Sequence, residues 1–166
     1  MFALSAGCGE LTPKQARERG VAFKVLNEKE GRALEALGDT LLPGAAAAGI
    51  THYVDHQLAS ATPLLILKYM DYPASFLDFY KQGLAALDRL AHARYGRVFS
   101  EISAAQRTDL VREISQNVPA EWSGPPAPLF YFVTRNDAVD VFYGTQEGFA
   151  KLDIPYMPHI APKEPW

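Results

Sequence analysis

The feature that most constrains the fold is a set of apolar side chains between Pro73 and Gly96 that recur every three or four residues. These residues are Phe76, Tyr80, Leu84, Leu87 and Ala91. Side chains at this spacing share one face of an α-helix. Proline is common in the first turn of a helix and glycine at its end. The segment therefore predicts a long amphipathic helix, whose apolar face other elements must cover.

Capping signals predict further helices on both sides of this one. Asn27 with Glu30, and Ser103 with Gln106, are both spaced as capping boxes, in which each side chain bonds the backbone of the other residue. Apolar residues at helical spacing follow both pairs. The expected helices cover residues 28–42, 50–59, 63–70, 73–96 and a segment that begins after Ser103.

The stretch "LFYFVTRNDAVDVFYG", residues 129–144, is ambiguous. Its first half is rich in residues that favour strands. Phe132, Asn136, Val139 and Tyr143, however, fit helical spacing. We favour a helix, because an isolated strand would find no pairing partner in the rest of the chain.

The two ends of the chain show no helical period. Residues 1–26 are expected to form an irregular arm or the remnant of a signal. Residues 148–166 contain four prolines, which exclude a continuous helix and predict an extended tail. The expected fold is all-α: a small bundle of about five to six helices within residues 27–147.

Composition excludes several classes of protein. The 166 residues are 48% hydrophobic, enough to bury a core, and the formal net charge of −3 offers no basic surplus for nucleic acid. The longest apolar runs are too short for a transmembrane segment. A single cysteine, Cys8, excludes an internal disulfide. Its context "SAGC" approaches a lipoprotein box, although Ser5 replaces the usual aliphatic residue; a clipped or disordered end is the simpler interpretation.

His52 and His56 are one helical turn apart, with Asp55 beside them. Two imidazoles at this spacing can ligate one metal ion, which would make the chain a stand-alone metal-binding enzyme. A site needs at least one further ligand, however, and the spacing of His92 and His159 selects neither. We therefore expect these residues to lie on a solvated polar face of the helix, with no metal bound.

The sequence contains no convincing catalytic constellation. It has no Gly-x-Ser-x-Gly elbow and no glycine-rich phosphate loop, so we expect no cofactor in this chain. Asp137 and Asp140 could serve acid–base chemistry only if burial raised their pKa values. We expect this pair to lie on a solvated helix face.

Large apolar residues are concentrated towards the end of the chain, within the proline-rich tail and just before it. A tail with this content is suited to lying along a groove on a partner, because proline limits the entropy lost on docking. The candidate partner-interface residues are Tyr143, Ile154, Tyr156, Met157, His159, Ile160 and Trp166.

Three stretches resemble a known family. "LEALGDTLLPG" followed by "AGITHYVDHQL", and then "FYKQGLAALDRLAHARYGRVFSEISAAQRTDLVREI", are similar to the gluconate 2-dehydrogenase subunit 3 family. "YGTQEGFAKLDIPYMPHIAPKEPW" looks like the ending of members that accompany glucoside and other sugar 3-dehydrogenases. The resemblance covers residues 34–166, and the two histidines of the second stretch are not a metal motif of that family.

The resemblance implies a small, non-catalytic (gamma) subunit of a bacterial complex. Its large partner would be a flavoprotein of the glucose–methanol–choline oxidoreductase type, which binds FAD and oxidises the sugar, and a cytochrome c would accept the electrons. The small subunit would act as a chaperone for this partner and assist its export to the periplasm, with any membrane association made through the complex. Such subunits often carry a twin-arginine signal, whereas "ARERG" has no adjacent arginines.

Overall fold

The structure is a computed structural model that describes residues 4–5 and 10–153. It confirms an all-α fold, and in the described part of the chain five helices have more than six residues. They are α2 (Glu28–Leu41), α4 (Ile50–Leu58), α5 (Phe76–Tyr95), α6 (Ala104–Gln116) and α7 (Ala127–Tyr143). The short elements are β1 (Leu4–Ser5), β2 (Glu10–Leu11), α1 (Pro13–Glu18), α3 (Ala45–Ala48), α8 (Gln146–Lys151) and the 3₁₀ turns η1 (Ile66–Tyr69) and η2 (Phe99–Glu101).

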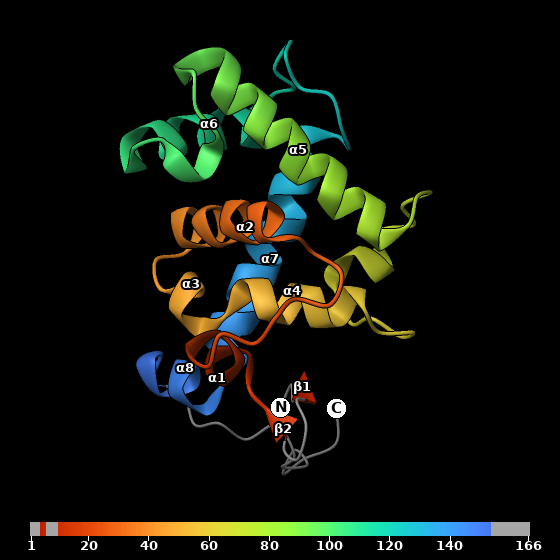
Figure 1. Ribbon diagram of the computed structural model, residues 1–166, viewed down its shortest axis with the longest axis vertical. Coiled ribbons are helices and arrows are strands. Elements are labelled where there is room, and N and C mark those ends of the chain that lie inside the picture. Colours follow the sequence, from red (N-terminus) through yellow and green to blue (C-terminus); the bar gives the residue numbers. More distant parts are fainter. Residues whose placement is uncertain (1–3, 6–9, 154–166) are drawn as a thin grey trace, which may run out of the picture.

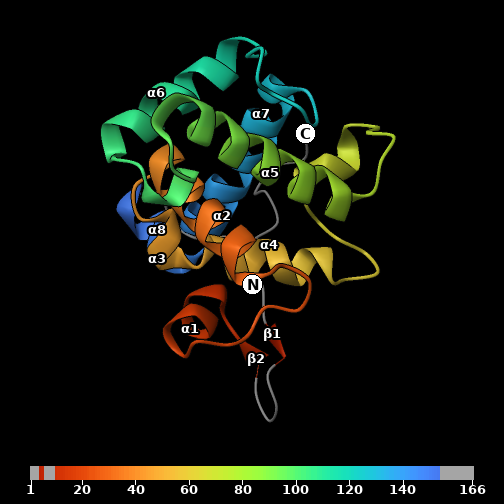
Figure 2. The same cartoon turned by 45° about the horizontal axis from the view of Figure 1, so that its top comes forward.

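Helix α7 runs through the middle of the molecule, behind α2 and α4 (Figure 1). It contacts α2, α3, α4, α5, α6 and α8, which explains why its sequence is apolar on nearly all sides. The ambiguous segment is thus a helix, as expected. Figure 2 shows α5 and α6 over one end of the molecule, with α1 and the short β1–β2 pair at the opposite end.

The helix boundaries follow their caps. The Asn27 side chain accepts the Glu30 N–H at 2.9 Å and Glu30 accepts the Asn27 N–H at 2.8 Å, so the predicted capping box is formed. Helix α5 begins at Phe76 and not at Pro73, because Ser75 provides the cap by accepting the Asp78 N–H at 3.0 Å. Gly96 ends it with a φ of 71°.

The core lies where α2, α4, α5 and α7 meet. Fully buried residues from these helices include Leu34, Leu37, Ile50, Val54, Leu87, Phe130 and Val133. The ring of Phe130 in α7 packs directly against the backbone of α5 at Gly83, where any Cβ would overlap this ring. No helix within the described residues has both the length and the apolarity that a membrane span requires.

Three further details differ from the sequence expectation. Residues 1–26 contain helix α1, which has its own capping box between Thr12 and Gln15. Only the 3₁₀ turn η1 forms in the segment expected to be helical from Pro63, since Leu65 is still extended. Helix α8 crosses the expected boundary at residue 148.

Candidate functional site

His52 is buried between α4 and the N-terminal arm. Its Nε2 lies 2.9 Å from the carbonyl oxygen of Val21, and its ring packs against Phe23 at 4.9 Å between centroids. A carbonyl only accepts, so Nε2 is the protonated nitrogen. The expectation that this side chain faces solvent is therefore wrong, because the arm, 31 residues earlier in the chain, covers it.

Asp55 is also buried and holds the same arm. Its carboxylate accepts three backbone N–H groups: from Lys24 at 2.7 Å, from Val25 at 3.0 Å and from Leu26 at 2.9 Å. Consecutive N–H groups that converge on one anion stabilise its charge without a metal or a basic side chain. Asp55 thus fixes the arm to α4, and the expectation of a solvated face is wrong here as well.

His56 is half-buried at the end of α4. Its Nδ1 lies 3.3 Å from the Lys24 ammonium. Burial, and then the charge of Lys24, lower the pKa of His56, while Asp55 acts in the opposite direction. Within the described residues no group of three or more His, Cys, Asp and Glu side chains could hold a metal ion. Metal ligation by His52 through Nε2 would also break its bond to Val21.

A second polar cluster lies inside the bundle. Asp137 is fully buried in α7, and its Oδ2 accepts a hydrogen bond of 2.6 Å from the hydroxyl of Tyr80 in α5. Its Oδ1 is buried without a hydrogen-bond partner among the described residues. Burial raises the pKa of Asp137 to about 8, Tyr80 opposes this rise and Asp140 adds to it. The expectation of a solvated carboxylate pair is wrong for Asp137, because α7 is enclosed by other helices.

Two tyrosines complete this cluster. Burial and the charge of Asp137 raise the pKa values of Tyr53 in α4 and of Tyr80, so both phenols stay protonated at neutral pH. Asp140 is more exposed, and partial burial raises its pKa. A catalytic acid must reach its substrate. Since Asp137 is enclosed, we interpret the cluster as a polar junction between three helices.

Of the candidate interface residues, the described part of the chain contains only Tyr143. It is half-buried at the end of α7, and its ring meets that of Phe142 at 4.8 Å in an edge-on arrangement. The others lie outside the described residues: Ile154, Tyr156, Met157, His159, Ile160 and Trp166. Their docking remains a prediction.

Sequence reasoning missed an exposed apolar surface. Leu64, Tyr69 and Met70, in the connection from α4 to α5, all face solvent. The available signal was the run "LLILKYM", which contains more large apolar residues than a single turn can bury. The described residues thus offer a surface for binding, whereas their polar clusters are enclosed.

Comparison with known proteins identifies one family. A family model described as gluconate 2-dehydrogenase subunit 3 matches residues 28–161, which include every helix from α2 to α8. No curated protein and no solved structure matches the chain.

Proposed function

Since the chain belongs to the gluconate 2-dehydrogenase subunit 3 family, we propose that it is the small, non-catalytic subunit of a bacterial sugar dehydrogenase complex. The observation that carries this proposal is the family match, which covers every helix from α2 to α8. The enclosure of Asp137 and the structural use of His52 and Asp55 support a role in binding over one in catalysis.

The catalytic partner we propose is a large flavoprotein of the glucose–methanol–choline oxidoreductase type. That subunit would hold FAD, which takes two electrons from the sugar or glycoside and passes them to a cytochrome c. The small chain has no glycine-rich turn to bind a dinucleotide pyrophosphate, which supports placing the flavin in the partner. The ending that resembles glucoside 3-dehydrogenase members favours a glycoside as substrate.

The role we propose for the small subunit is that of a chaperone in the periplasm. It would assist the folding, export and stability of the flavoprotein and then stay bound. The tail, residues 154–166, would provide apolar anchors such as Tyr156 and Trp166. Buried aromatic anchors commonly contribute about 2 kcal/mol or more each to an interface. Loss of two would weaken association roughly a thousandfold.

Co-expression with the large subunit tests this function. We expect the two chains to co-purify with bound flavin and with sugar-dependent dye reduction, and we expect neither property from the small chain alone. A small chain truncated after Leu152 should keep its thermal stability but should no longer co-purify with the large subunit. Flavin binding or sugar oxidation by the isolated chain would refute the proposal, and full assembly of the truncated chain would refute the role of the tail.

The competing hypothesis is a stand-alone metal enzyme that uses His52 and His56. Ligation through the Nε2 of His52 would break its bond to the Val21 carbonyl, and among the described residues no third His, Cys, Asp or Glu side chain completes a metal site.

A further inference from the structure

The connection between α4 and α5, residues 59–75, is pinned to the core. Leu65 and Leu67 are fully buried, and the buried side chain of Gln57 accepts the Leu64 N–H at 2.7 Å. Backbone bonds from Lys68 to Leu65 and from Met70 to Leu67 close the turn η1. The segment therefore has a defined shape, and little entropy would be lost if a partner bound it.

This pinned segment presents apolar side chains to solvent. Tyr69 is 69% exposed, Leu64 is 52% exposed and Met70 is 39% exposed. The other large apolar residues that are exposed in the described chain, such as Val118 and Tyr95, belong to separate elements. Single exposed apolar residues are normal on a protein surface, whereas several exposed apolar side chains on one short turn indicate an interaction site.

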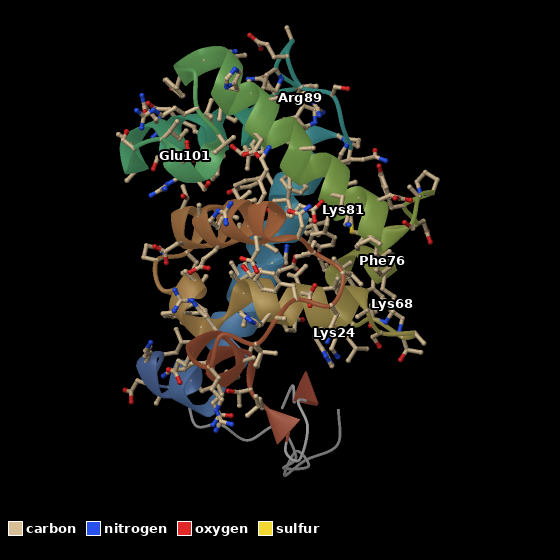
Figure 3. The ribbon with its side chains drawn as sticks, in the orientation of Figure 1. Lys24, Lys68, Phe76, Lys81, Arg89 and Glu101 are labelled. Carbon is tan, nitrogen blue, oxygen red and sulfur yellow. The ribbon has the colours of Figure 1, made fainter. Side chains whose placement is uncertain are left out.

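Two cations accompany this surface without carboxylate partners. Among the described residues, neither Lys24 nor Lys68 forms an ion pair; the Lys24 ammonium contacts His56, and that of Lys68 lies 5.8 Å from the centre of the Tyr69 ring. Figure 3 shows both lysines at the end of the molecule where α4 meets this connection. Asp71 is the only acidic residue from Leu64 to Tyr72, and it does not pair with Lys68.

We propose that the segment Leu64–Met70, which we call the apolar turn, docks on the large subunit of the complex. This inference rests on the proposed function and specifies a surface for it. The partner site would be an apolar depression that receives Leu64, Tyr69 and Met70, with carboxylates at its rim opposite Lys68 and Lys24. A second copy of the chain is a poorer occupant, because a two-fold contact through this surface would bring the same lysines of both copies together.

The test compares Leu64→Ser/Tyr69→Ser/Met70→Ser with wild type for binding of the purified large subunit. All three side chains face solvent, so the thermal unfolding midpoint of the isolated variant should stay close to that of wild type. Val118→Ser is the matched control, because Val118 is 61% exposed in a different loop. We expect the triple variant to bind at least tenfold more weakly and the control to bind normally.

Lys68→Glu tests the chemistry of the rim without removing any apolar group. It should slow association severalfold at low salt, and the difference from wild type should shrink as salt rises. The inference is refuted, with the function intact, if wild type binds and the triple variant binds equally well. Faster association of Lys68→Glu would refute the carboxylate rim.

Two further measurements separate other occupants. Sedimentation of the isolated chain should show a monomer in wild type and triple variant alike. Wild type should also not co-sediment with vesicles of phosphatidylcholine and phosphatidylglycerol. If wild type forms a dimer or binds vesicles and the triple variant does not, the apolar turn makes that contact, and docking on the large subunit is refuted. If wild type fails to bind any large subunit, the proposed function falls and this inference with it.

Discussion

Asp137→Asn should remove a pH-dependent loss of stability. The pKa of this carboxyl is about 8 in the folded chain, against an ordinary value of 3.8 that applies to the unfolded one. A raised folded pKa means that the unfolded state releases its proton first, so stability is fully present below the unfolded pKa and is lost as pH rises towards 8. With a folded pKa of about 8, linkage lowers the unfolding free energy by roughly 2 kcal/mol at pH 5 and by about 4 kcal/mol at pH 7.

The measured quantity is the difference in unfolding free energy between variant and wild type, from urea denaturation followed by circular dichroism. We expect this difference to move in favour of the variant by about 2–3 kcal/mol between pH 5 and pH 7. The amide oxygen of asparagine can still accept the Tyr80 hydroxyl. Its buried NH₂ group adds a cost of about 1–3 kcal/mol that does not depend on pH, so the slope and not the absolute value carries the test.

Asp71→Asn is the control, because it makes the same chemical change on an exposed residue. Its positive φ of 46° is one that asparagine tolerates. The control should follow the wild-type pH profile. Parallel profiles for Asp137→Asn and wild type would refute the raised pKa of Asp137, and a difference of the opposite sign would show that folding lowers this pKa.

Three further outcomes follow from the contacts of α4. Asp55→Ala leaves three backbone N–H donors without their acceptor and should lower the unfolding free energy by about 3–5 kcal/mol. Hydrogen exchange at residues 24–26 should become faster, and unchanged exchange there would contradict the role of this carboxylate. Gly49→Ala should lower the unfolding free energy by about 1–3 kcal/mol, because the φ of Gly49 is 87° and a Cβ would overlap the carbonyl of Pro13. A thermal unfolding midpoint equal to that of wild type would refute this prediction. His52→Ala/His56→Ala should leave the content of zinc and iron unchanged in elemental analysis, whereas a near-stoichiometric loss of either metal would restore the metal-site hypothesis.

The parts of the fold that the sequence predicted correctly depend on neighbouring residues. A capping box needs only two side chains three positions apart, so Asn27 with Glu30 placed the start of α2 correctly. The burial of Asp55 and Asp137 depends instead on groups 29–31 and 57 residues away in the chain. No local pattern distinguishes these carboxylates from surface ones, and a polar residue on an amphipathic helix is usually solvated.

Local patterns also do not determine which apolar side chains face solvent. Tyr143 is half-buried, and its place at an interface stays a prediction from its aromatic ring. Leu64, Tyr69 and Met70 belong to a run for which the sequence predicts a short helix, whereas only a 3₁₀ turn forms there. The burial of Leu65 and Leu67 between them determines which side chains face outward, and that depends on the packing of the whole connection.

The hydrogen bonds between Asp55 and the arm join residues outside the family match to the helical bundle. The segment that the family model matches is therefore shorter than the segment that folds as one unit. Sequence similarity begins at Glu28, the first residue of α2. A fragment trimmed to start there would contain every matched residue, yet the carboxylate of Asp55 would lose its three N–H partners and the imidazole of His52 would lose its acceptor. A fragment of this chain that begins at Glu28 should therefore be less stable than one that keeps the arm from Val21 onward.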